Sequence, residues 1–445
     1  MKSRQRTLQH NESNQTDFPD KAGPPRGHLE EDEGYVCLSE QPRKHGLNIR
    51  RAAYVWRKCL AQAGVEAGCS GAHPVNFDMS QKRFSVFSVE KVPFRFPGIL
   101  ALERTNPSES VGAIMFPDQI FYEPAVLDYP LGRQLREKYA GLPWTAIENH
   151  NRIDALRANP NSAFPKMKRH LVLGVRKTHR YVPNQKISDF LVPYTSSGCT
   201  AMCLYCYLVC HYNKCAYLRL FVNREQMLDK LMKTAANADR DLTFEIGSNS
   251  DLVLENTITG NLPWTIERFA DSPKGFLTFP TKFDMVESLL PLRHNGRTIV
   301  RMSVNPEEII RKVELGTSPL ANRIRALNRL CEAGYRPGLL IAPVILTENW
   351  KASYTRLIER LSDELSPAVK RQAAIEIIFM TYSFVHRAIN DEAFPNALKL
   401  YDQTLMTGRG AGKYCYRPEQ RDQAEYFLRQ ELEKRLGEMP ILYIV

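Results

Sequence analysis

Gly198-Cys-Thr-Ala-Met-Cys-Leu-Tyr-Cys-Tyr207 is the stretch of this 445-residue chain that says most about its chemistry and its fold. Its three cysteines, Cys199, Cys203 and Cys206, are separated by three and then by two residues. That spacing brings three thiolates to one [4Fe-4S] cluster and leaves the fourth iron without a cysteine ligand. A four-cysteine cluster mostly carries electrons, whereas an open iron can bind a substrate or cofactor directly.

An open iron predicts S-adenosylmethionine (AdoMet) as the cofactor, since the amino and carboxylate groups of AdoMet can chelate it. An electron from the reduced cluster can then break a sulfonium bond and release a 5′-deoxyadenosyl radical. Tyr205, the aromatic residue directly before the last cysteine, completes the pattern CxxxCxΦC. This pattern is typical of radical SAM enzymes, so we expect Cys199, Cys203 and Cys206 to hold the cluster.

Two alternatives explain the cysteines without a cluster. Zinc takes four sulfur or nitrogen ligands, and a zinc site could draw them from Cys203, Cys206, Cys210, His211 and Cys215. Such a site would leave Cys199 without a role. The other alternative is a group of buried structural cysteines, which requires five of the ten cysteines to gather within seventeen residues by chance.

Composition indicates a globular protein with a substantial core. The chain is 43% hydrophobic, its start MKSRQRTLQH is too polar for a signal peptide, and no run approaches the ~18 apolar residues that cross a bilayer. Ten cysteines, half of them in one short stretch, favour thiolate chemistry in a reducing compartment over disulfides. We therefore expect a cytoplasmic protein without a membrane segment.

The charge distribution separates the chain near residue 114. The net charge of +11 favours a polyanionic partner such as nucleic acid, and most of the basic excess lies after this point. Residues 1–114 combine scattered charges, the acidic run 30–33 and several Pro and Gly, with a helical pattern only near 47–63. We expect this N-terminal extension to be largely disordered or weakly folded.

Strand and helix patterns alternate in the second half of the chain, which predicts βαβ units and a parallel sheet. A first strand precedes the cysteine loop near 190–194, and five more are expected at 241–246, 276–279, 298–304, 338–345 and 374–380. Amphipathic helices are expected at 224–238, 283–292, 306–315, 319–334 and 350–362. About six units fit, so we predict an α/β fold with a partial (βα)6 TIM-like barrel, whose active residues lie at the carboxyl ends of the strands.

Those strand ends carry polar residues that could hold a cofactor across the barrel mouth. The segments are Phe244–Asp251, Pro280–Lys282, Met302–Asn305 and Ile341–Pro343. Each has an ordinary structural reading as well, since Asn305 precedes Pro306 at a helix start and Ser250 or Asp251 could cap a helix. Their alignment at the same end of successive strands favours the cofactor site.

From residue 117 to residue 445 the chain resembles the spore photoproduct lyases, radical SAM enzymes of spore-forming bacteria that split the thymine dimer called spore photoproduct. The resemblance is carried by the cysteine loop with Tyr205-Cys-Tyr-Leu208 and by Ile120-Phe-Tyr-Glu-Pro124, Tyr129-Pro-Leu-Gly132, Leu173-Gly-Val-Arg-Lys-Thr178, Arg219-Leu-Phe-Val-Asn223, Arg293-His-Asn-Gly296 and Gly410-Ala-Gly-Lys-Tyr414. Residues 1–114 have no counterpart in the family, so we expect an unrelated extension or an upstream start before Met115.

The resemblance implies four regions and specific roles. The regions are the extension 1–114, a family-specific segment 115–185, the barrel 186–385, and a C-terminal segment 386–445 that binds substrate or DNA. The AdoMet site would be lined by Tyr205, Ser250, Asp251, Lys282, Ser303, Asn305 and Ala342. Tyr207 would lie beside the reacting base and take part in radical transfer, while Arg409 and Lys413 would face the lesion. Interpreted from its own residues and without the family resemblance, the Gly-rich run 408–413 is either a flexible loop or a phosphate-binding nest.

The implied partners follow from the implied reaction. Hydrolytic acid–base chemistry does not cut the methylene bridge between two thymines, whereas a primary carbon radical can start its fragmentation. The substrate would be damaged double-stranded DNA with the thymine dimer flipped out of the duplex. A flavodoxin or ferredoxin would supply electrons to the cluster, and we expect a monomer in the bacterial cytoplasm, within the spore core.

The chain departs from the family pattern at one position. The family's hydrogen-donor cysteine lies at the end of the second strand, and Ser248 occupies that place. An O–H bond is much stronger than an S–H bond, so serine cannot replace the thiol. Either Cys210, Cys215 or Cys415 donates instead, or the chain is a radical SAM enzyme with a different substrate. A non-catalytic iron–sulfur or zinc module that binds DNA is the third hypothesis.

Overall fold

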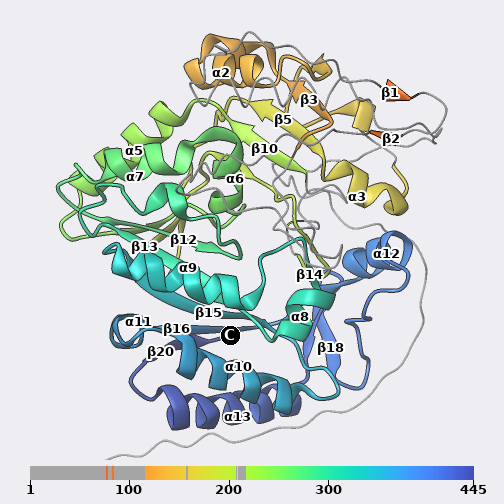
Figure 1. Ribbon diagram of the computed structural model, residues 1–445, viewed down its shortest axis with the longest axis vertical. Helices are drawn as coiled ribbons and strands as arrows, with labels where there is room; N and C mark the ends of the chain where they lie inside the picture. Colours follow the sequence, from red (N-terminus) through yellow and green to blue (C-terminus); the bar gives the residue numbers. More distant parts are fainter. Residues whose placement is uncertain (1–76, 79–82, 85–115, 157–158, 207, 209–216) are drawn as a thin grey trace, which may run out of the picture.

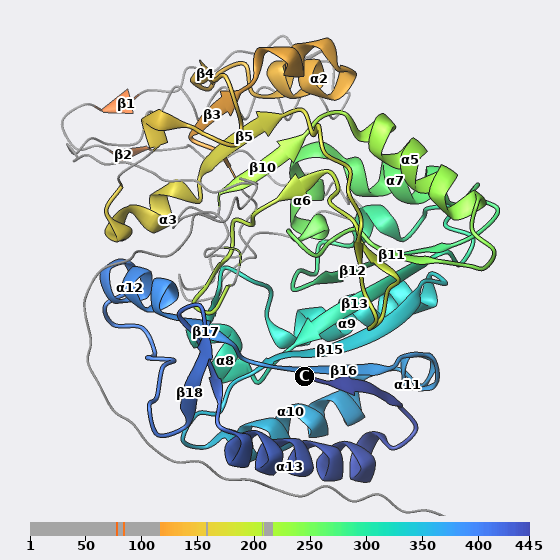
Figure 2. The same ribbon diagram turned by 180° about the vertical axis from the view of Figure 1, so that it is seen from behind.

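The computed structural model describes residues 77–78, 83–84, 116–156, 159–206, 208 and 217–445. An eight-stranded sheet forms its centre, in the order β20-β16-β15-β13-β12-β11-β7-β6 (Figures 1 and 2). All but the edge strand β6 run parallel to their neighbours. The strands are β6 (Val182–Pro183), β7 (Phe190–Leu191), β11 (Thr243–Glu245), β12 (Phe276–Thr281), β13 (Thr298–Val304), β15 (Arg336–Val344), β16 (Ile375–Phe379) and β20 (Ile441–Ile444).

Helices follow the parallel strands in the alternation that the sequence predicts. They are α5 (Arg224–Ala236), α6 (Leu252–Thr259), α7 (Asn261–Phe269), α8 (Glu307–Lys312), α9 (Leu320–Glu332), α10 (Trp350–Glu364), α11 (Pro367–Gln372), α12 (Phe384–Ala393) and α13 (Pro418–Leu436). The predicted α/β class with a curled, mostly parallel sheet is therefore confirmed; its six predicted strands are present, and β20 adds a seventh parallel strand. No helix among the described residues is long and apolar enough to span a bilayer.

A second sheet precedes the barrel, in the order β4-β3-β5-β10-β8. Its strands are β3 (Gln119–Tyr122), β4 (Trp144–Ala146), β5 (His170–Gly174), β8 (Ser196–Ser197) and β10 (Leu218–Phe221), and the short helices α2 (Pro130–Lys138) and α3 (Phe164–Met167) accompany it. Residues 190–198 connect the two sheets. Val192 donates its N–H to Glu245 O on one side at 2.8 Å, and Phe221 donates to Thr195 O on the other at 2.8 Å.

Two of the predicted helices are wrong in extent. Over 283–292 the chain forms only the 3-10 turn Glu287–Leu289, because Asp284 is held by side chains of the next βα unit. Ser318 and Asn322 both donate to its carboxylate, at 2.5 and 2.8 Å. The helix expected over 306–315 ends at Lys312, and the two residues Glu314–Leu315 form strand β14 instead. The prediction that residues 1–114 are largely disordered or weakly folded concerns a segment that lies almost wholly outside the described residues.

A buried arginine joins several strands inside the barrel. Arg301 on β13 places Nη2 2.7 Å from Glu245 Oε2 on β11, donates from Nη1 to Glu376 Oε2 on β16 at 3.0 Å, and donates from Nε to Thr278 Oγ1 on β12 at 3.0 Å. Tyr443 on β20 also donates to Glu376. Most of the other buried residues on the surrounding strands are apolar, as in parallel sheets covered by helices. Arg301 therefore fixes the relative positions of these strands.

Arg301→Leu should lower the free energy of unfolding by about 3–5 kcal/mol, because Glu245 and Glu376 would stay buried without their counter-charge. The matched control is Arg293→Leu, which removes an exposed pair with Asp271 at 2.6 Å and should cost less than about 1 kcal/mol. Urea unfolding followed by circular dichroism measures both variants. Equal, small losses would contradict this role of Arg301.

Candidate active site

A cavity of about 1110 Å³ opens at the carboxyl ends of the parallel strands. It brings together most of the residues that the sequence singled out, although they lie up to about two hundred positions apart in the chain. Those that line it are Cys199, Cys203, Tyr205, Cys206, Ser248, Ser250, Asp251, Lys282, Ser303, Ala342, Arg409 and Lys413. The cysteine loop forms one wall, the ends of β12, β13 and β15 form another, and a C-terminal hairpin forms the rim.

The cysteine loop is held in place through its backbone. Strand β9 (Met202–Cys203) pairs antiparallel with β14, in the register Glu314 with Cys203. Gly198 enters the loop with a φ of 82°, and a Cβ there would lie 2.1 Å from Tyr217 O, so only glycine fits. These contacts hold the loop against the barrel mouth.

Side chains from distant elements bind the carbonyls of the same loop. Lys168 donates to Cys199 O at 2.7 Å, Asn390 on α12 donates to Leu204 O at 2.7 Å, and His386 Nε2 contacts Cys206 O. Sequence reasoning missed all three, because nothing near Lys168 or in α12 carries a motif. The loop is thus fixed from three directions.

The three thiols suit a cluster better than a single metal ion. Burial raises the pKa of Cys199 to about 12, and it raises the pKa of Cys203 further. These thiols therefore deprotonate readily only when they coordinate a metal. Among the described residues, no three His, Cys, Asp or Glu side chains converge closely enough for one ion. In a cluster each cysteine binds a different iron, so its ligands need no such convergence.

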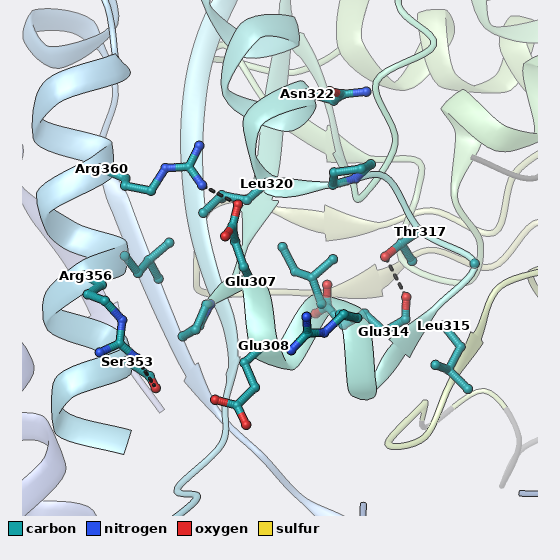
Figure 3. A pocket seen from close by; sticks show the side chains of 16 residues that line it. Glu307, Glu308, Glu314, Leu315, Thr317, Leu320, Asn322, Ser353, Arg356 and Arg360 are labelled. Carbon is teal, nitrogen blue, oxygen red and sulfur yellow. Dashed lines mark hydrogen bonds and ion pairs between the residues drawn. The ribbon is translucent and has the colours of Figure 1, made fainter. Parts of the chain in front are cut away.

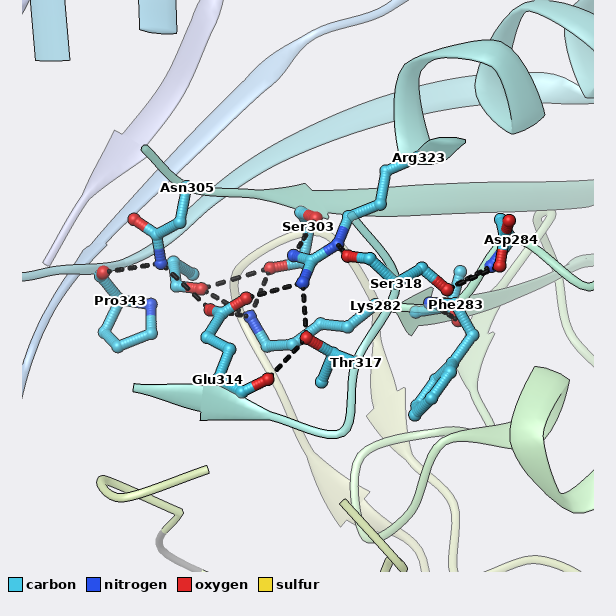
Figure 4. Close-up of polar contacts among 12 residues, drawn as sticks. Lys282, Phe283, Asp284, Ser303, Asn305, Glu314, Thr317, Ser318, Arg323 and Pro343 are labelled. Atoms are coloured by element: carbon cyan, nitrogen blue, oxygen red, sulfur yellow. Dashed lines mark hydrogen bonds and ion pairs between the residues drawn. The ribbon is translucent and has the colours of Figure 1, made fainter. Parts of the chain in front are cut away.

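A polar network supports the opposite wall (Figure 4). Lys282 donates from Nζ to Ser303 Oγ at 2.6 Å, to Ala342 O at 2.7 Å and to Glu314 Oε1 at 2.9 Å. Burial alone would raise the pKa of Glu314, but Lys282 and Arg323 outweigh it and lower the pKa to about 2. Glu314 is therefore a buried carboxylate ion. Sequence patterns did not identify Glu314, since it lies in a stretch with helical periodicity.

Two of the other predicted residues have local structural partners. Asp251 caps α6, accepting from the N–H groups of Val253 and Leu254 at 3.1 and 3.2 Å, and it also accepts from Lys282 N at 2.9 Å. Ser250 Oγ lies 2.6 Å from Ser196 Oγ. The capping interpretation of Asp251 is thus correct, and the cap also orients the strand end that carries Lys282.

Comparison with known proteins identifies the family. A protein-family model described as "Spore photoproduct lyase" matches residues 115–445. The chain belongs to the spore photoproduct lyase family. The spore photoproduct lyase of Bacillus subtilis (strain 168) is 33% identical over 325 residues, which are 71% of this chain and 94% of that protein. That of Clostridium acetobutylicum is 30% identical over 339 residues, 74% of this chain and 98% of that protein.

Solved structures of spore photoproduct lyase have the same fold. One in complex with dinucleoside spore photoproduct superimposes with a TM-score of 0.70 at 28% identity and covers 75% of this chain and 100% of that chain. A variant with bound AdoMet and dinucleoside spore photoproduct gives the same values. The α/β fold is therefore the fold of the family.

The Gly-rich run of this family member is a β-hairpin. Strands β18 (Met406–Gly410) and β19 (Lys413–Tyr416) pair antiparallel, and β19 also pairs with β17 (Tyr382–Ser383). Residues 408–413 thus belong to a hairpin, and the phosphate-nest interpretation of this run stays a prediction. Arg409 and Lys413 are exposed and point their charges to the rim of the cavity.

The remaining predicted residues lie elsewhere. Asn305 is fully buried behind the wall, where Nδ2 donates to Glu314 Oε1 at 3.0 Å and to Pro343 O at 3.1 Å. Cys415 on β19 is not among the residues that line the cavity. Tyr207, Cys210 and Cys215 lie outside the described residues, as does His211 of the zinc alternative.

A second cavity of about 1020 Å³ lies on the outer side of β14, between α8 and α10 (Figure 3). Two pairs of its polar side chains bind each other. Arg360 pairs with Glu307, and Arg356 donates to Ser353 Oγ at 3.2 Å. None of the residues that the sequence predicted lines it, so the cavity at the strand ends is the candidate active site.

Asn390→Ala should speed amide hydrogen exchange over residues 199–206 about tenfold, because a buried loop carbonyl loses its donor. The control is Asn328→Ala, since Asn328 Nδ2 donates to Glu364 O at 2.8 Å on the exposed side of the barrel. Exchange measured by mass spectrometry compares the two variants. Unchanged exchange in the Asn390 variant would show that α12 does not hold the loop.

Proposed function

We propose that this protein is a radical SAM DNA-repair lyase that splits spore photoproduct back to two thymines. The observation that carries the proposal is the single cavity shared by the CxxxCxΦC cysteines, the polar strand ends and two rim cations. Membership of the spore photoproduct lyase family supports it, as does the likeness to a lyase solved with dinucleoside spore photoproduct.

The residues present fit the two cofactors of such an enzyme. Cys199, Cys203 and Cys206 would hold a [4Fe-4S] cluster, and AdoMet would lie between it and the wall built by Tyr205, Ser250, Asp251, Lys282, Ser303, Asn305 and Ala342. When bound, the two cofactors supply a 5′-deoxyadenosyl radical. The fixed cysteine loop would set where the radical forms.

The rim is suited to a flipped thymine dimer. Arg409 and Lys413 project from the hairpin at the cavity mouth, where they would hold phosphates of double-stranded DNA and make binding salt-sensitive. A lesion must leave the duplex to reach such a cavity, at a cost of a few kcal/mol of unstacking that damage reduces. In this proposal residues 386–445, which include the hairpin, form the substrate-binding segment.

The hydrogen donor is the open question of this chemistry. Ser248 lines the cavity where the family's donor cysteine is expected. In the part of the chain that the structure describes, the only thiols lining the cavity belong to the three proposed cluster ligands. We propose that Cys210, Cys215 or Cys415 donates the hydrogen atom. Cys415 would have to reach the cavity from the neighbouring strand β19.

The same fold could act on another substrate, and Ser248 is the observation that favours this second candidate. A reducing flavodoxin or ferredoxin, a monomeric state and a location in the spore core complete the proposal. We propose these three points from the family to which the chain belongs.

Incubation with a defined spore photoproduct dinucleotide tests the proposed reaction. Anaerobically reconstituted protein with AdoMet and a reductant should release the repaired dinucleotide, whereas Cys203→Ala should lose bound iron and sulfide together with AdoMet cleavage. An unchanged lesion with active AdoMet cleavage would favour the other substrate. A wild-type protein without a cluster would leave only a non-catalytic role.

Separate Cys→Ala replacements at Cys210, Cys215 and Cys415 test the relocated donor. At least one should divert the product from clean thymines to adducts, because the thymine radical would lack its hydrogen source. Adding Ser248→Cys to that variant should restore thymines without adducts. Mass spectrometry of the products measures the adduct fraction for the single and the double variant. Clean thymines from all three single variants would contradict the proposal.

A further inference from the structure

Glu314 lies at the centre of the network behind the cavity wall. Its Oε1 atom accepts hydrogen bonds from Tyr205 OH at 2.5 Å, from Lys282 Nζ at 2.9 Å and from Asn305 Nδ2 at 3.0 Å. Three of the residues proposed for the AdoMet site therefore meet at one atom. Glu314 is itself buried and does not line the cavity, so it cannot contact a ligand there.

The second carboxylate oxygen fixes Glu314 from the other side. Its Oε2 accepts from Arg323 Nη2 at 2.7 Å, and Arg323 is fully buried. The same guanidinium donates to Ser303 O at 2.9 Å, to Ser318 O at 2.8 Å and to Thr317 Oγ1 at 2.7 Å. A planar guanidinium with four fixed partners has one orientation, so the carboxylate has one as well.

The position of Glu314 in the chain adds a connection to the cysteine loop. Its backbone is in register with Cys203 across the β9–β14 pair. Val313, the preceding residue, accepts the N–H of Leu204 at 2.9 Å. The backbone of Glu314 thus pairs with that of a proposed cluster ligand. Its side chain accepts hydrogen bonds from residues proposed for the AdoMet site.

Lys282 is held by this carboxylate together with two other acceptors. All three hydrogens of its ammonium are used, by Ser303 Oγ, Ala342 O and Glu314 Oε1. A long, flexible lysine side chain keeps one conformation only while such contacts outweigh its rotamer entropy. Without Glu314, two buried or half-buried cations would face each other with no anion between them.

We propose that Glu314, oriented by Arg323, is a positioning residue that holds Lys282, Tyr205 and Asn305 in place for AdoMet and ties them to the cysteine loop. The proposal rests on the proposed function, because it assumes that AdoMet binds at this wall. Its effect should appear in AdoMet binding and in the signal of the cluster rather than in cluster assembly.

Glu314→Gln in the full-length, cluster-loaded protein tests the proposal. Iron and sulfide content should equal that of the wild type, while the AdoMet dissociation constant from calorimetry should rise about tenfold or more, as expected for loss of hydrogen bonds to a charged group. The change that AdoMet causes in the EPR spectrum of the reduced cluster should shrink as well. Glu308→Gln is the matched control, since Glu308 is exposed on α8 and pairs only with Lys312 among described residues.

The possible outcomes distinguish failure of the proposed function from failure of the positioning role of Glu314. If wild-type protein with a full cluster does not bind AdoMet, the proposed function fails. If wild-type binds AdoMet and Glu314→Gln binds it equally with the same spectral change, the positioning role is overturned. Arg323→Lys keeps a positive charge beside the Glu314 carboxylate but loses the several hydrogen bonds of the guanidinium. It therefore provides a milder second test. A folded Arg323→Lys protein with wild-type AdoMet affinity would also overturn the role.

Discussion

The placement of the candidate site depends on segment 190–198, which is hydrogen-bonded to a strand on each side. This segment hydrogen-bonds to β11 on one side and to β10 on the other, so it joins the barrel to the N-terminal sheet. The cysteine loop begins where the segment ends, at Gly198. Because both flanking strands are central to their sheets, the start of the loop cannot shift without breaking hydrogen bonds in both.

The interior of the barrel contains two separate networks of buried charged residues. Arg301 and its two glutamates lie among the strands, whereas Glu314 and its two cations lie behind the cavity wall. Buried ion pairs contribute little net stability compared with apolar packing, since desolvation offsets their attraction. What they do provide is a fixed geometry. The first network fixes strands, and the second fixes side chains that face the cavity.

The sequence was most informative where residue spacing reflects chemistry or strand period. The cysteine spacing, the six parallel strands and the polar strand ends could all be predicted, since apolar runs of strand length stand out between helical patterns. Glu314 could not, because its two-residue strand is created by pairing with β9 and not by its own neighbours. Asp284 shows the same limit, since side chains from another βα unit hold it out of a helix. The N-terminal sheet was missed because its strands are short and separated by irregular segments.

The hairpin and the cysteine loop share one support. Strand β17 pairs with the hairpin strand β19, and helix α12 begins at the next residue and binds the loop through His386 and Asn390. The hairpin that would hold DNA is thus hydrogen-bonded to the strand that continues into α12, the helix that holds the cysteine loop. In the proposed enzyme, DNA bound at the hairpin and a cluster bound at the cysteine loop would act on the same helix, α12. In the proposed enzyme, loading of the cluster and binding of the lesion would therefore be coupled through α12.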